Sequence, residues 1–242
     1  MGGNYFRRYE KKYQLNAFQY YELSESLKGL AETDEYGFSD IYSLYFDTED
    51  YRIMRRCIDA KGYKEKLRLR AYGLPGPEGW VYLELKKKLQ GLTYKRRLPL
   101  RYGELAAYLD ERCAQQQYGQ IDNEIDWFIR THRPGPRFQV AYKRLALRGI
   151  EDPEFRVTFD SHIRCCPSGL DFAGSNTVPM IGAGEYIMEI KCIAAIPGCL
   201  SRQLSALRIF PVSFSKSVRA YGLLCGKPPV FDECLYAAPM MA

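Results

Sequence analysis

The chain has 242 residues and a hydrophobic content of 46%, which suits one sizeable core, and we favour a single β-rich domain over two smaller ones. A formal net charge of +6 indicates an anionic partner, but an excess of this size does not separate nucleic acid, nucleotide and membrane surface. The Cys residues form no C-x-x-C pair and the two His residues lie far apart, which argues against a zinc site.

Signals for membrane insertion or export are weak. No apolar run approaches the roughly 20 residues that cross a bilayer, and the charged segment 7–12 leads into no apolar signal-peptide region. We therefore expect a soluble, cytoplasmic protein with no transmembrane segment of its own, although a membrane partner is compatible with this. Its thiols are expected to be reduced and structural, and the adjacent Cys165 and Cys166 are the candidates for a redox switch.

Alternating strands and one well-capped helix organise the first half of the chain. Asn16 is a good helix N-cap with Gln19 at the capping-box position, so a helix is predicted directly after Asn16. A short helical turn is predicted over residues 49–56. The period-2 pattern predicts strands over residues 5–15, 41–47, 63–72, 80–89 and 93–100, the last three forming a meander.

The second half mixes helices and strands. Helices are predicted over residues 102–113, 121–132 and 198–210, with a last short one ending at Leu224. Strands are predicted over residues 137–148, 154–164 and 185–192, and the Gly/Ser/Asn-rich segment 167–184 is predicted to be a loop. This order predicts one domain over residues 4–225 and a tail over residues 226–242.

Several predicted strands carry Lys or Arg on every second residue. In segment 63–72, Lys64, Lys66, Arg68 and Arg70 would share one face of a strand, opposite an apolar face. For any single row a solvated outer face is the commoner interpretation. The rows recur, however, in segments 84–88, 144–148, 156–160 and 189–191. Together they favour a cation-lined interior that holds a phosphate chain, because Arg and Lys are suited to phosphate and an eight-stranded barrel has room for one slender ligand.

Eight segments, taken in order, resemble the vacuolar transporter chaperone (VTC) domain, the polyphosphate polymerase branch of the triphosphate tunnel metalloenzymes. They are residues 8–12 (RYEKK), 44–47 (LYFD), 67–73 (LRLRAYG), 84–86 (ELK), 141–144 (AYKR), 155–160 (FRVTFD), 189–191 (EIK) and 214–216 (FSK). No single segment is specific, but the eight together span nearly the whole chain. The resemblance implies an α+β fold: a closed, antiparallel, eight-stranded β-barrel with helices packed outside.

The resemblance also implies a set of site residues. Carried over by matching motif, the catalytic phosphate-contacting residues are Lys12, Arg68, Arg70, Lys86, Arg144, Arg156 and Lys216, and further phosphate ligands are Arg8, Lys66 and Lys191. Glu189 would hold a divalent cation, Mn²⁺ or Mg²⁺. Glu10, Glu84 and Asp160 are further candidates, of which Glu10 and Glu84 could instead pair with neighbouring cations. Tyr45 and Tyr142 are expected to pack with a hydrogen-bonding tip.

The implied activity is transfer of the γ-phosphoryl group of ATP to inorganic polyphosphate. Hydrolytic relatives are expected to carry Glu-x-Glu-x-Lys on the first strand, where this chain has Arg8, Glu10 and Lys12. Fewer carboxylates favour a second phosphate chain as acceptor over an attacking water. Two alternatives stay open: a tripolyphosphatase or nucleoside triphosphatase, and a non-catalytic module that binds polyphosphate or inositol phosphate. Nucleic acid is not an expected partner, because no helix clusters base-reading residues.

Overall fold

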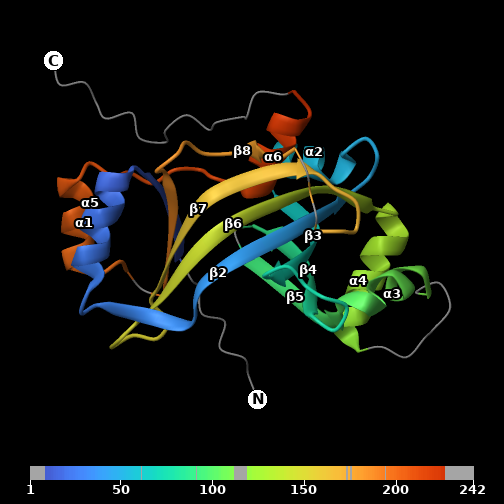
Figure 1. Ribbon diagram of the computed structural model, residues 1–242, viewed down its shortest axis with the longest axis horizontal. Helices are drawn as coiled ribbons and strands as arrows, with labels where there is room; N and C mark the ends of the chain where they lie inside the picture. Colours follow the sequence, from blue (N-terminus) through green and yellow to red (C-terminus); the bar gives the residue numbers. More distant parts are fainter. Residues whose placement is uncertain are drawn as a thin grey trace.

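The computed structural model describes residues 9–60, 62–90, 92–111, 119–172, 174, 176–193 and 195–226 (Figure 1). The strands in these ranges are β1 (Tyr9–Leu15), β2 (Ala31–Asp47), β3 (Tyr63–Tyr72), β4 (Trp80–Leu89), β5 (Leu92–Arg101), β6 (Gly135–Gly149), β7 (Arg156–Pro167), β8 (Val178–Pro179) and β9 (Tyr186–Cys192). The α-helices are α1 (Ala17–Leu27), α2 (Arg52–Asp59), α3 (Leu105–Glu111), α4 (Gln120–His132), α5 (Gly198–Ala206) and α6 (Lys216–Leu224).

All nine strands belong to one antiparallel sheet, which confirms a mixed α+β fold. The strand order is β1-β9-β7-β6-β2-β3-β4-β5, and β8 pairs with β7. Among the described strands no ladder joins β5 to β1, so the expected closed, eight-stranded barrel is not confirmed and the sheet is open. Pro99 on β5 has no N–H to donate, and Lys95 and Arg97 place charge on the same strand; both features are typical of sheet edges.

Helices cover the sheet in three groups (Figure 1). The first pair, α1 and α5, lies side by side at one end of the molecule, α2 contacts α6, and α4 packs against β5. The predicted start of α1 is confirmed, since Asn16 Oδ1 accepts from the Gln19 amide at 2.8 Å and Gln19 Oε1 accepts from the Asn16 amide at 3.0 Å. Among the described helices, none is both long and apolar enough to cross a membrane.

Most predicted elements are present, and the main differences lie in polar segments. The strand β2 begins at Ala31 rather than at residue 41, with a register shift between Thr33 and Phe38. Its first half is rich in exposed polar side chains and therefore shows no apolar alternation. The predicted loop 167–184 contains the short strand β8, and the segment predicted as a helix over 102–113 starts as a 3₁₀ turn, Tyr102–Glu104. Residues 227–242 of the predicted tail lie outside the described ranges.

The alternation of β3 decides which way its cations face. Leu67, Leu69 and Ala71 are fully buried in a cluster that includes Leu83 of β4 and Phe128 of α4. Each buried Leu side chain contributes about 1.5–3 kcal/mol to folding. Because successive side chains of a strand point to opposite faces, burial of this apolar face directs the basic row to the other, concave face of the sheet.

Candidate functional site

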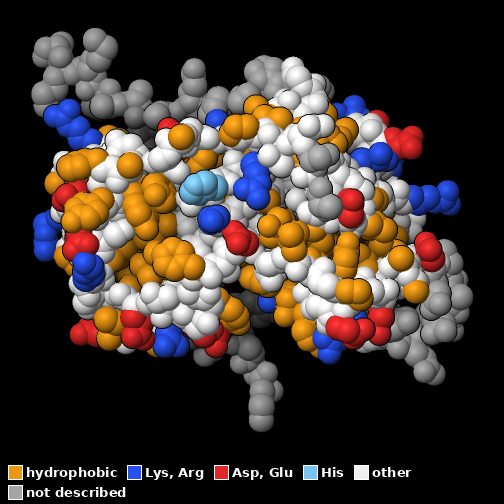
Figure 2. All heavy atoms as spheres, in the orientation of Figure 1, with side chains coloured by type: hydrophobic (Ala, Val, Ile, Leu, Met, Phe, Trp, Pro, Cys, Tyr) orange, Lys and Arg blue, Asp and Glu red, His pale blue; other side chains and the backbone are white. Residues whose placement is uncertain are grey.

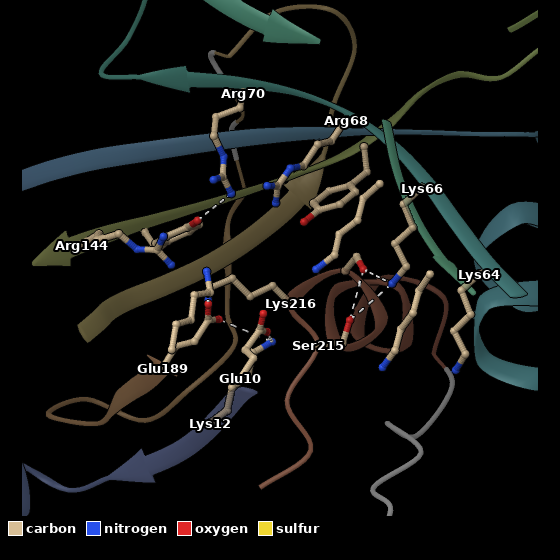
Figure 3. Close-up of a pocket in the computed structure, with 16 residues that line it drawn as sticks. Glu10, Lys12, Lys64, Lys66, Arg68, Arg70, Arg144, Glu189, Ser215 and Lys216 are labelled. Atoms are coloured by element: carbon tan, nitrogen blue, oxygen red, sulfur yellow. Dashed lines mark hydrogen bonds and ion pairs between the residues drawn. The ribbon is translucent and has the colours of Figure 1, made fainter. Parts of the chain in front are cut away.

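The concave face of the sheet encloses a cavity of about 260 Å³ (Figure 3). Its lining is strongly basic. Among the described residues, ten Lys and Arg line it, together with two Glu, two Tyr and two Ser: Lys12, Lys64, Lys66, Arg68, Arg70, Lys86, Lys88, Arg144, Lys191, Lys216, Glu10, Glu189, Tyr45, Tyr142, Ser215 and Ser217. These side chains come from β1, β2, β3, β4, β6, β9 and the start of α6, so strands far apart in the sheet order meet around one space.

The basic rows of β3 and β4 lie directly opposite each other. Lys66 faces Lys86, and Lys64 faces Lys88, in the antiparallel register. Like charges in directly opposed positions destabilise a sheet. Burial disfavours the ammonium form and lowers the pKa of Lys66, whose Nζ donates to Ser217 Oγ at 2.7 Å. An anion between the two strands would relieve both the repulsion and the cost of burial.

Asp160 holds two of the cavity cations in place. This carboxylate is fully buried on β7 and accepts two hydrogen bonds from Arg144, at 2.6 and 2.7 Å, and one from Lys216 Nζ at 2.5 Å. Although burial opposes ionisation, the charges of Lys216 and Arg144 lower the pKa of Asp160. Asp160 thus joins β6 to the first turn of α6 and sets the direction of both cations.

Glu84 of β4 likewise holds cations in place. It is buried on β4 and accepts from Arg68 Nε at 2.8 Å and from Arg97 Nε at 2.8 Å, while Lys95 Nζ lies 2.6 Å from its Oε1. Burial raises its pKa, but the nearby cations outweigh that effect and hold the pKa well below the usual range. Glu84 therefore positions Arg68, and it does not line the cavity itself.

Glu189 and Glu10 are the carboxylates that face the cavity, and both lie beside Lys12 (Figure 3). Lys12 Nζ is 3.4 Å from Glu10 Oε1 and 3.7 Å from Glu189 Oε2, and it donates to the Phe214 carbonyl at 3.0 Å. Lys191 Nζ lies 2.7 Å from Glu189 Oε1. Despite burial, which opposes ionisation, Lys191 and Lys12 keep the pKa of Glu189 well below its usual range, so this carboxylate is charged.

Among the described residues, the donor set permits a hard divalent cation beside Glu189 and Glu10. Mg²⁺ is commonly held by one or two carboxylates together with substrate phosphates and water, which fits Glu189 and Glu10. Asp160 and Glu84 do not fit, because both are fully buried outside the cavity lining and their oxygens are paired with guanidinium and ammonium groups. Within the described ranges, no three or more His, Cys, Asp or Glu side chains form a group that could hold a metal ion.

The predicted site residues separate into three groups. Lys12, Lys66, Arg68, Arg70, Lys86, Arg144, Glu189, Lys191, Lys216 and Glu10 all line the cavity, and Glu84 and Asp160 support it from behind. Arg156 is exposed and outside the lining, although it lies directly opposite Lys191 in the β7–β9 ladder and so shares the concave face. Arg8 lies outside the described residues.

Six lining residues were missing from the predicted set or had only a packing role in it: Lys64, Lys88, Tyr45, Tyr142, Ser215 and Ser217. Lys64 and Lys88 belong to basic rows that were recognised in the sequence, although neither was predicted there as a site residue. Tyr142 accepts a hydrogen bond from Arg70 at 3.0 Å, and Lys216 Nζ lies 4.7 Å from its ring centroid. Ser217 binds Lys66, a contact that only the placement of α6 creates.

The VTC domain family model matches residues 7–225, nearly the whole chain. The chain belongs to the VTC domain family. No curated protein matches the sequence.

Solved structures that resemble this VTC domain are distant from it. A provisionally named adenylate cyclase from Vibrio parahaemolyticus has a TM-score of 0.46 at 10% identity, over 88% of this chain and 96% of the other. A protein from Pyrococcus horikoshii OT3 has a TM-score of 0.39 at 12% identity, over 83% and 89%. A chain in the structure of the Schizosaccharomyces pombe Mediator head module has a TM-score of 0.38 at 11% identity, over 91% of this chain and 96% of the other.

Proposed function

We propose that this VTC-domain protein is a polyphosphate polymerase that transfers the γ-phosphoryl group of ATP to a growing inorganic polyphosphate chain. One observation carries the proposal: ten Lys and Arg side chains and only two carboxylates line the described cavity. A linear polyanion with charge on every unit suits cations that repeat about every 6.6–6.8 Å along a strand. Family membership supports the same conclusion.

The side chains supply position and charge rather than a nucleophile. Phosphoryl transfer needs in-line alignment and stabilisation of charge spread over the phosphoryl oxygens. Arg68 and Arg144 suit this because Glu84 and Asp160 fix their guanidinium groups. A terminal oxygen of the acceptor chain forms the new bond to the γ-phosphorus, the bond to the β–γ bridging oxygen breaks, and ADP leaves.

The first turn of α6 adds a second kind of phosphate ligand. Ser215, Lys216 and Ser217 line the cavity at the start of this helix, where unpaired backbone N–H groups favour anions. Glu189 and Glu10 would hold Mg²⁺ or Mn²⁺. When bound, such an ion neutralises charge on the phosphate oxygens.

A product analysis tests the proposal. The purified protein is incubated with γ-labelled ATP, Mn²⁺ and a short polyphosphate primer, and ADP, free phosphate and chain length are measured in one reaction. We expect the primer to lengthen while little free phosphate forms. Free phosphate equal to ADP without chain growth would instead identify a triphosphatase, and binding without turnover would identify a binding module.

A further inference from the structure

The concave face continues beyond the cavity as a cluster of aromatic and Arg side chains, which we call the aromatic rim. It consists of Tyr36, Tyr72, Trp80, Tyr82, Arg97 and Arg101. Tyr72 follows the cavity residue Arg70 by two positions on β3, and Tyr82 lies directly opposite Arg70 on β4. Two residues of a strand span about 6.6–6.8 Å, so the rim begins at about this distance from Arg70, the cavity cation next to it on β3.

The rim presents stacked, planar groups. The rings of Tyr36 and Tyr72 stack with centroids 6.2 Å apart, and Tyr72 meets Tyr82 edge to face at 5.8 Å. The Arg97 guanidinium lies 4.5 Å from the centroid of Tyr82, and that of Arg101 lies 3.8 Å from the centroid of Trp80. Aromatic and guanidinium planes are the surfaces on which nucleobases stack.

Two local devices build the rim. Asp34 Oδ1 accepts from the amides of Tyr36 and Gly37, at 2.9 and 3.0 Å, and Gly37 has a left-handed φ of 49°. This irregularity in β2 brings Tyr36 onto Tyr72. Arg97 is fixed by the Tyr72 hydroxyl at 2.8 Å and by Glu84, the carboxylate that also holds Arg68 of the cavity. One hydrogen-bonded network therefore joins rim and cavity.

The rim is open to solvent although it is well ordered by these contacts. The exposed fractions are 64% for Tyr36, 50% for Trp80 and 41% for Tyr72. Aromatic rings of this size normally contribute to cores or interfaces, so their exposure beside a phosphate-type cavity indicates a ligand surface. Continuity with the cavity favours a ligand that carries both phosphates and a flat, apolar group.

We propose that the aromatic rim binds the base of a nucleoside triphosphate whose phosphates lie against Arg70 and Arg68. The inference rests on the proposed function and adds the part of the site that distinguishes a nucleotide donor from a bare phosphate chain. In this arrangement the sugar spans the distance of about 6.6–6.8 Å between Arg70 and Tyr72 along β3. Stacking is tolerant of base identity, so purine triphosphates are expected to bind with similar affinity.

Trp80 provides a direct reporter of base binding. The sequence has two Trp residues, and Trp127→Phe leaves Trp80 as the single one. In this background, ATP is expected to quench the Trp80 emission saturably, whereas inorganic triphosphate is expected to compete with ATP without quenching. Quenching by both ligands alike, or by neither while both bind, would overturn the rim assignment.

Tyr72→Leu tests the contribution of stacking to affinity. We expect the ATP affinity to fall about five-fold or more, while the affinity for inorganic triphosphate changes less than about two-fold. Tyr21→Leu, on the exposed face of α1, is the matched control and is expected to change neither affinity. Tyr36→Leu repeats the test at the most exposed rim position, should loss of the Tyr72 hydroxyl disturb folding.

The outcomes separate the two proposals. If wild type binds inorganic triphosphate and the Tyr36 and Tyr72 variants bind ATP as tightly as wild type, the rim assignment fails and the proposed function stands. Equal losses for ATP and triphosphate would also overturn the rim assignment, because the change would then act on the phosphate cavity. If wild type binds neither ligand, both proposals fail.

Discussion

At the scale of single residues, the four carboxylates around the cavity divide into two kinds. Asp160 and Glu84 are fully buried and saturated by cations, so they orient Arg and Lys side chains. Glu189 and Glu10 face the cavity and keep oxygens within reach of a ligand or cation. All four were metal candidates on sequence grounds. Their burial separates them, because the side chains of Asp160 and Glu84 are 1% exposed, against 12% for Glu189 and 38% for Glu10.

Replacing Asp160 is expected to cost stability at neutral pH. Asp160→Asn leaves Arg144 and Lys216 without their buried partner, so the free energy of unfolding should fall by about 3–5 kcal/mol. The folded pKa of Asp160 is lowered, so its contribution is complete above the unfolded value of about 3.9 and is lost as the pH falls toward the folded pKa. Urea unfolding should show a constant gap between variant and wild type from pH 7 to about 5 that narrows below about pH 4.

The Asp160 prediction has an internal control. A saturating triphosphate should restore part of the lost stability, because an anion replaces the missing negative charge between Arg144 and Lys216. Asp126→Asn, on α4 and distant from the cavity, should lose far less, since its partner Arg130 is mostly exposed. A gap that persists unchanged in strong acid would contradict the charge-pair account.

Glu189→Gln separates cation binding from phosphate binding. The change keeps the size of the side chain and removes the negative charge that attracts a divalent ion. Chain extension should fall by orders of magnitude, whereas the affinity for inorganic triphosphate should stay equal or increase, because a cavity carboxylate is lost. Product analysis and calorimetry measure the two effects. Glu22→Gln on α1 is the control, and an active Glu189→Gln protein would sink the metal assignment.

At the scale of elements, opposed rows of like charge link stability to ligand binding. Lys86 faces Lys66 across β3 and β4, and removing one charge removes a repulsion of about 0.2–1 kcal/mol. Lys86→Met should therefore leave the melting temperature of the free protein equal or slightly higher. The rise in melting temperature on adding triphosphate should become smaller. Lys143→Met, on the opposite face of β6, should leave that increase unchanged. Thermal melts with and without triphosphate decide it.

The capping box of α1 was identifiable from sequence because its residues are three positions apart, and both hydrogen bonds are present. Asn16→Ala should lower the free energy of unfolding by about 1 kcal/mol and leave ligand affinity unchanged, since neither Asn16 nor any residue of α1 lines the cavity. Asn16→Asp should retain most of the stability. A loss of ligand affinity in Asn16→Ala would contradict this separation.

At the scale of the whole molecule, charge is unevenly distributed. On the face shown in Figure 2, Lys and Arg are interspersed with Asp and Glu, whereas the cavity concentrates cations. The modest net charge of +6 therefore understates the local field. Triphosphate affinity should decrease as salt is raised from about 0.05 to 0.5 M, because many cavity cations remain partly open to solvent and screening. Calorimetry that finds salt-independent binding would count against the cavity as the phosphate site.

Local pattern alone determined much of this protein. The period-2 alternation of β3 follows from backbone geometry, so the sequence predicted which cations share a face, and it predicted the boundaries of elements with apolar repeats. The first half of β2 was not predictable in this way, since its exposed polar residues leave no periodic signal.

Only the tertiary structure decided which rows meet and what holds them. The register places Lys12 beside Glu189 and Arg144 beside Asp160, and α6 brings Lys216 to the same carboxylate. Among the described strands no ladder forms between β5 and β1, so the concave sheet is open where a closed barrel was expected. Strand pairing depends on contacts between residues far apart in the chain. Each contact contributes a small free energy, and their sum cannot be predicted from the local sequence pattern.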